Sequence, residues 1–143
     1  MMPILSKDRI LLQSSAADKT EAIRKAGELL VKSGCVLAPY IDGMLAREQT
    51  MSTSLGNGVA IPHGVYENRD HILKTGISVL QLVDGVDWDD GEKVYLIIAI
   101  AACGDEHVNV LANLANVIDD EDRLAELLRA KDPEIIVKHL GDN

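Results

Sequence analysis

The hydrophobic and polar positions of this chain recur at two spacings, one typical of strands and one typical of amphipathic helices. Residues 94–102 are almost continuously apolar, which predicts a central strand covered on both faces. Shorter runs predict strands at residues 10–12 and 59–61 and an alternating strand at residues 75–82. The segment 84–91 is rich in Asp and Gly, and it predicts turns around a small edge strand.

Two helices are predicted between the first two strands. Asp18 stands three residues before Glu21 in a capping-box arrangement, which marks a helix start. Gly34 is suited to end that helix. Pro39 occupies a favoured first-turn position of the second helix, and Arg47 lies in its last turn.

Three more helices are predicted after the long apolar strand. One begins at residues 104–105, one surrounds residues 124–128, and one follows Pro133. Helices on both sides of the strands in sequence predict an α/β fold, a mixed sheet of about five strands sandwiched between helix layers. The chain shows no repeat or long linker, so we expect a single domain over residues 1–143.

The turn after residues 59–61 holds the most informative side chain. His63 stands between Pro62 and Gly64. A residue before proline is pushed to extended backbone, so Ile61 should end a strand. Proline fixes one backbone angle and glycine permits unusual ones, so both interrupt regular structure. The sequence therefore predicts that His63 is displayed on a short, stiff turn at a strand end.

The chain has three other histidines, His71, His107 and His139. His139, near the end of the last helix, is interpreted as a solvated residue placed favourably on the helix dipole. His71 is interpreted as an ordinary residue of a polar loop. His107 lies in the first turn of the helix after the long strand, and taken alone it is most simply a half-buried packing residue. If the strands before His63 and His107 are parallel neighbours, both imidazoles emerge at one sheet edge, and a helix N-terminus keeps His107 neutral.

Three chemistries can be tested against this pair of histidines. Zinc needs several ligands, and no HxxxH, HxxE or Cys-rich cluster supplies them, so we expect no metal and no cofactor. A serine hydrolase is disfavoured because no GxSxG motif is present. Nucleophilic histidine catalysis needs a neutral, exposed ring and a cradle for the charge of the transferred group. Arg47 could supply that charge for a phosphoryl group, and it could equally be a solvated arginine at a helix end.

Composition narrows the choice of partners. The net charge is −9, which repels nucleic acid and anionic membranes and attracts a basic protein. Aromatic residues make up 3% of the chain, which disfavours stacking on bases. No apolar run reaches the length of a membrane span, and the N-terminus shows no leader pattern. Two distant cysteines in no CxxC spacing favour reduced thiols, so we expect a cytoplasmic protein without membrane insertion.

The stretch Asn57-Gly-Val-Ala-Ile-Pro-His-Gly64 resembles the phosphorylation motif of the enzyme IIA domains of the mannitol/fructose class, which belong to the bacterial phosphoenolpyruvate-dependent sugar phosphotransferase system. The similarity covers essentially the whole chain, including residues 21–24, 44–48, 73–76, 98–102 and 106–108. The Glu106-His107 segment and residues 114–121 resemble the mannitol branch more closely than the fructose or nitrogen-regulatory branches.

The resemblance implies a phosphocarrier with a mixed α/β sheet. The histidine matching His63 accepts a phosphoryl group on Nε2 from the phosphocarrier HPr. It then passes the group to a cysteine of a IIB domain or IIBC permease, which supports mannitol uptake and phosphorylation. The residues matching His107 and Arg47 lie beside the phosphohistidine and stabilise it.

Alternatives remain open at this point. Within the family, the chain could serve fructose or another polyol, or be a nitrogen-type regulator that uses His63 as a switch. Outside catalysis, it could be an interaction module that has lost transfer. The chain carries no IIB or IIC segment, so those are expected on separate chains.

Overall fold

The centre of the molecule is a five-stranded mixed sheet with the strand order β1-β4-β5-β3-β2. The structure, a computed structural model, describes residues 4–141. The strands are β1 (Ile10–Ser14), β2 (Ser54–Gly56), β3 (Val59–Ala60), β4 (Gly76–Asp87) and β5 (Lys93–Ala101). β1 pairs in parallel with β4, and β3 pairs in parallel with β5. The pairs β4–β5 and β2–β3 are antiparallel.

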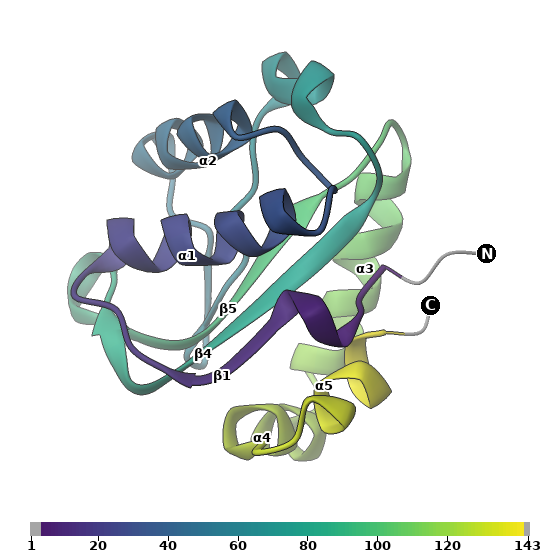
Figure 1. Ribbon diagram of the computed structural model, residues 1–143. Helices are drawn as coiled ribbons and strands as arrows, with labels where there is room; N and C mark the ends of the chain where they lie inside the picture. The colour runs from purple at the N-terminus through teal and green to yellow at the C-terminus, as the bar shows by residue number, and fades with distance from the viewer. Residues whose placement is uncertain (1–3, 142–143) are drawn as a thin grey trace.

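Helices cover both faces of this sheet (Figure 1). α1 and α2 pack on one face, and α3, α4 and α5 pack on the other. The α-helices are α1 (Lys19–Lys32), α2 (Pro39–Thr50), α3 (Glu106–Ile118), α4 (Glu121–Arg129) and α5 (Pro133–Leu140). Three short 3-10 helices complete the described elements: η1 (Lys7–Arg9), η2 (Tyr66–His71) and η3 (Asp89–Gly91). The predicted mixed sheet between helix layers is therefore confirmed.

Each face of the sheet has its own hydrophobic core, because successive strand residues point to opposite faces. In β5, Leu96, Ile98 and Ile100 contribute to the core under α3, α4 and α5. Ile97 and Ala99 contribute to the core under α1 and α2. The uninterrupted apolar run of β5 thus fills two cores at once, as its sequence predicted.

The first helix begins at its predicted cap. Asp18 Oδ1 accepts a hydrogen bond from Glu21 N at 2.8 Å, which satisfies one free N–H of the first turn. Gly34 follows the helix with φ +80°, a left-handed conformation that side chains other than glycine rarely adopt. α3 begins at Glu106, directly after the predicted start at residues 104–105, and α5 begins at Pro133. α4 spans Glu121–Arg129 and includes the predicted residues 124–128.

One strand prediction was wrong, and one strand was missed. The segment 84–91 holds no separate small strand, because its first residues continue β4 to Asp87, where Val86 pairs with Val94 of β5. The Asp and Gly residues that suggested turns begin within an irregular part of β4, where the pairing register shifts between Gln81 and Val86. β2 was missed because three residues are too few to show a period.

Candidate functional site

His63 lies beyond the end of β3, on a segment that still runs beside β5. His63 and Ile100 form an isolated parallel bridge, and Ile100 N donates to Pro62 O at 3.0 Å. Ile61 N donates to Thr53 O at 3.0 Å on the other side. The backbone just before His63 is thus hydrogen-bonded to β5 on one side and to Thr53 on the other. These bonds confirm the predicted stiff turn at a strand end.

A buried tyrosine secures the far end of this turn. Tyr40, in the first turn of α2, is 2% exposed. Its hydroxyl donates to Ile100 O at 2.7 Å and accepts from Gly64 N at 2.9 Å. A Cβ added at Gly64 would lie 2.8 Å from both Tyr40 Cε1 and Asn68 Oδ1, so only glycine fits there.

The ring of His63 is held in one tautomer. Its Nδ1 lies 2.8 Å from Ile61 O. A carbonyl oxygen only accepts, so in this contact Nδ1 carries the proton and donates. In the neutral ring Nε2 is therefore unprotonated, with its lone pair available for attack.

The surroundings favour the neutral form of the ring. Burial lowers the pKa of His63 below its ordinary 6.5, and His107 and the charge of Arg47 act in the same direction. The Ile61 carbonyl and the Glu48 carboxylate act in the opposite direction, and the net shift of the pKa is downward. His63 is half-buried, so it is partly shielded from water while still reaching the surface.

His107 lies next to His63, as the sequence predicted for parallel neighbouring strands. It stands in the first turn of α3, and the two ring centroids are 5.0 Å apart with the planes tilted by 58°. Burial also lowers the pKa of His107 below 6.5. The pair therefore consists of two imidazoles that are both neutral near pH 7.

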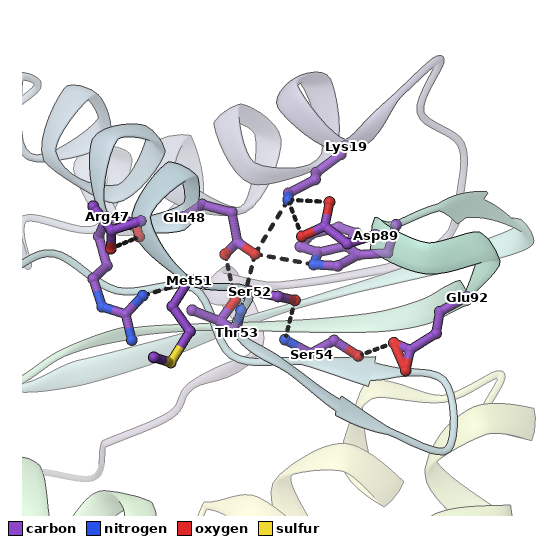
Figure 2. Close-up of polar contacts among 11 residues, drawn as sticks. Lys19, Arg47, Glu48, Met51, Ser52, Thr53, Ser54, Asp89 and Glu92 are labelled. Atoms are coloured by element: carbon purple, nitrogen blue, oxygen red, sulfur yellow. Dashed lines mark hydrogen bonds and ion pairs between the residues drawn. The ribbon is translucent and has the colours of Figure 1, made fainter.

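Arg47 stands in the last turn of α2. Its Nη1 donates to Met51 O at 2.7 Å, and its side chain is half-buried (Figure 2). Its positive charge is a lesser cause of the lowered pKa of His63, after burial and the neighbouring His107. The structure thus places His107 against the ring of His63, whereas Arg47 is linked to that ring through its charge.

The other two histidines lie elsewhere. His71 ends η2, and its carbonyl accepts from Leu37 N at 2.8 Å. The interpretation of His139 as a solvated residue was wrong. Its side chain is 9% exposed, and its Nε2 lies 2.6 Å from Glu126 Oε1. The pair joins α5 to α4, a contact between helices that sequence spacing does not reveal.

Sequence reasoning missed two polar residues that shape the site. The sequence carries no sign of the role of Tyr40, because an aromatic residue in a helix usually belongs to the core. The partners of its hydroxyl are also distant in sequence. Glu48 is a buried carboxylate in the last turn of α2, next to Arg47. An exposed and a buried glutamate look alike in a sequence, so no local signal distinguishes it.

The chemistry open to this arrangement is group transfer on a ring nitrogen. Between residues 4 and 141, no three His, Cys, Asp or Glu side chains gather in a way that could hold a metal ion. Across the described part of the chain, no helix is long and apolar enough to cross a membrane. The fold and site define an α/β protein that displays a neutral histidine with Nε2 free, a ring that can take up a group on that nitrogen.

The family to which the chain belongs agrees with that class. The family described as "Phosphoenolpyruvate-dependent sugar phosphotransferase system, EIIA 2" matches residues 3–143. The chain belongs to this enzyme IIA family and is therefore a phosphotransferase-system component.

A mannitol-specific enzyme IIA component is among the relatives of this chain. The chain is 41% identical over 141 residues to a mannitol-specific phosphotransferase enzyme IIA component of Geobacillus stearothermophilus, covering 99% of this chain and 97% of that relative. It is 51% identical over 115 residues to a multiphosphoryl transfer protein of Escherichia coli O157:H7. That match covers 80% of this chain and 30% of the relative, so the chain spans under a third of that longer protein.

A solved structure shares the fold closely. The chain matches a structure of the complex of enzyme IIAMTL and phosphorylated enzyme IIBMTL from Escherichia coli with a TM-score of 0.88. The sequences are 38% identical, and the match covers 95% of this chain and 96% of the other.

Proposed function

We propose that this protein is a mannitol-type enzyme IIA phosphocarrier. His63 accepts a phosphoryl group from phospho-HPr and passes it to a cysteine of a mannitol-type IIB domain or IIBC permease. The observation that carries the proposal is the 2.8 Å contact between His63 Nδ1 and Ile61 O, which leaves Nε2 free to attack. The proposed reaction takes place in the cytoplasm.

The first transfer forms one bond and breaks one. The Nε2 lone pair of His63 attacks phosphorus, and the bond between phosphorus and the donor histidine nitrogen breaks, returning its electron pair to the donor. No proton has to leave Nε2, because the proton of the neutral ring is on Nδ1. Phosphorylation places positive charge on the ring, and the carbonyl of Ile61 stabilises the Nδ1–H that shares it.

The second transfer reverses the roles. A thiolate of the IIB cysteine attacks phosphorus, the bond from phosphorus to Nε2 breaks, and the lone pair returns to His63. Catalysis of both steps consists of alignment and stabilisation of charge in a loose transition state. Arg47 supplies positive charge, and a neutral His107 can donate a hydrogen bond to a phosphoryl oxygen. The N-terminus of α3, which carries His107, also favours a nearby anion.

The comparisons support both the sugar and the acceptor. A full-length relative is a mannitol-specific IIA component, and the matching solved structure is a complex with phosphorylated IIB. The negative surface, with 23 acidic and 14 basic residues, suits a donor with a basic face.

Phosphorylation by enzyme I, HPr and phosphoenolpyruvate tests this function. We expect wild-type protein to gain one acid-labile, base-stable phosphoryl group and His63→Ala to gain none. The matched control is His139→Ala, which removes a histidine of α5 and should still be phosphorylated. An unphosphorylated wild type would contradict the carrier function, and a phosphorylated His63→Ala would contradict the site.

The acceptor test addresses the sugar. Phosphorylated protein is mixed in turn with IIB domains of the mannitol and fructose type, and loss of label from the IIA protein is followed. We expect faster transfer to the mannitol-type IIB domain. Faster transfer to the fructose-type domain would contradict the mannitol assignment while leaving the carrier function intact.

A further inference from the structure

Glu48 is a carboxylate placed almost out of contact with water. Its side chain is 2% exposed. Thr53 contributes two donors, its Oγ1 at 2.5 Å from Oε1 and its N at 2.9 Å from Oε2. Trp88 Nε1 donates to Oε2 at 3.1 Å, and Lys19 Nζ lies 3.4 Å from the same oxygen. Burial of a charged carboxylate destabilises a fold unless hydrogen bonds and an opposite charge compensate for the lost water, as they do here.

These partners come from three different parts of the fold (Figure 2). Thr53 precedes β2, Trp88 follows β4, and Lys19 is the first residue of α1. The Lys19 ammonium also lies 5.2 Å from the centre of the Trp88 ring and 2.9 Å from Asp89 Oδ1. Glu48 therefore ties the end of α2 to β2, to the β4–β5 hairpin and to α1.

The same helix end carries Arg47, the immediate neighbour of Glu48. Arg47 Nη1 donates to Met51 O, and Thr50 Oγ1 donates to Arg47 O at 2.8 Å. Hydrogen bonds within the segment from Arg47 to Thr53 therefore restrain its backbone. Arg47 bonds to Thr50 and Met51, and Glu48 bonds to Thr53. Figure 2 shows the two side chains leaving the helix in different directions, Glu48 toward Lys19 and Arg47 away from it.

We propose that Glu48 is a positioning residue for phosphoryl transfer, which holds the last turn of α2 so that the charge of Arg47 acts on His63 and its phosphoryl group. The side chain of arginine is long and flexible. Its guanidinium can be held at one place only if the backbone that carries it is fixed. Thr53, the principal partner of Glu48, also accepts from Ile61 N through its carbonyl. The contacts of Glu48 therefore join the segment that bears Arg47 to the segment that leads to His63.

The charge of Glu48 supports the same role. Its carboxylate raises the pKa of His63, whereas Arg47 lowers it. The two neighbouring residues thus act on the imidazole with opposite charges. A residue that served only to join α2 to the hairpin would have no effect on transfer through Arg47.

A double-mutant cycle separates these roles, and it rests on the proposed function. The rate of phosphoryl transfer from phospho-HPr is measured for wild type, Glu48→Gln, Arg47→Ala and the double variant. We expect Glu48→Gln to slow transfer by about ten-fold or more, because small misplacement of a charge partner has effects of that order. In the Arg47→Ala background, Glu48→Gln should cause no further slowing.

Glu92→Gln is the matched control. Glu92 is an exposed carboxylate whose Oε2 accepts from Ser54 Oγ at 2.6 Å, so it also joins β2 to the hairpin but lies away from Arg47. We expect it to transfer at the wild-type rate. The pKa of His63, followed by NMR, should fall in Glu48→Gln and stay unchanged in Glu92→Gln.

The outcomes are distinguishable. Equal slowing by Glu48→Gln with and without Arg47, or no slowing at all, would overturn the positioning role while wild-type transfer upholds the proposed function. A wild type that accepts no phosphoryl group would instead contradict the proposed function. If Glu48→Gln does not fold, Thr53→Val serves, since it removes one donor and keeps the charge. Wild-type transfer by Thr53→Val would also overturn the inference.

Discussion

At the scale of single residues, the site depends on one proton and its location. Ile61 O fixes that proton on Nδ1 of His63, and burial makes a second proton on the ring unfavourable. The same ring on an exposed loop would be partly protonated near pH 6.5 and would exchange tautomers. The structure thus gives an ordinary histidine a neutral ring whose Nε2 is the atom that would attack phosphorus in the proposed transfer.

The pH dependence of phosphoryl acceptance should show this shift. Burial lowers the pKa of His63, so the neutral form persists as the pH falls through 6.5, and the rate should decline only at lower pH. NMR titration of the His63 ring in folded protein, compared with the urea-unfolded chain, measures the pKa directly. A folded-state midpoint at or above that of the unfolded chain would contradict the expected shift.

At the scale of elements, the pairing of β3 with β5 creates the site. β3 has two residues, yet it sets His63 beside the end of β5, from which the chain enters α3 and reaches His107. Tyr40 adds a contact from α2 to both strands' ends. Three elements that are separate in sequence therefore determine where the imidazole lies.

Replacing Tyr40 tests that contact. Tyr40→Phe leaves Gly64 N and Ile100 O without the hydroxyl that joins them, and it should lower the free energy of unfolding by about 1–2 kcal/mol. Phosphoryl transfer should also slow, because the turn that carries His63 loses one of its restraints. Urea unfolding and the transfer rate measure the two effects. Tyr95→Phe, at a side chain 37% exposed in β5, is the control and should change neither.

At the scale of the whole molecule, charge governs encounters with partners. The net charge of −9 produces a field that attracts a basic surface, and added salt screens that field. This property belongs to no single residue of the site. It should affect how often donor and acceptor meet, and not the transfer of the group once they have met.

Salt should therefore slow the bimolecular step selectively. We expect the second-order rate constant for phosphorylation by phospho-HPr to fall about ten-fold from low to high ionic strength. The rate at saturating donor serves as the internal control and should change little. A second-order rate constant that is independent of salt would contradict electrostatic recruitment.

Local signals were sufficient for much of this protein. Asp18 and Pro39 predicted helix starts, Pro62 and Gly64 predicted the turn of His63, and the run of residues 94–102 predicted the central strand. They were sufficient because capping, proline geometry and hydrophobic periodicity act over a few neighbouring residues. The motif around His63 also led to the enzyme IIA family, and the family match confirms it.

The tertiary structure decided which residues face one another. His63 and His107 are separated by 44 positions in the sequence, yet their ring centroids are 5.0 Å apart. The Tyr40 hydroxyl reaches a carbonyl 60 residues away, and Trp88 reaches Glu48 across 40 residues. Burial, hydrogen-bond partners and pKa shifts depend on such distant contacts, which no local pattern encodes. The sequence alone therefore determined the elements, the turn and the family, whereas the folded chain determined the tautomer of His63, the restraint from Tyr40 and the burial of Glu48.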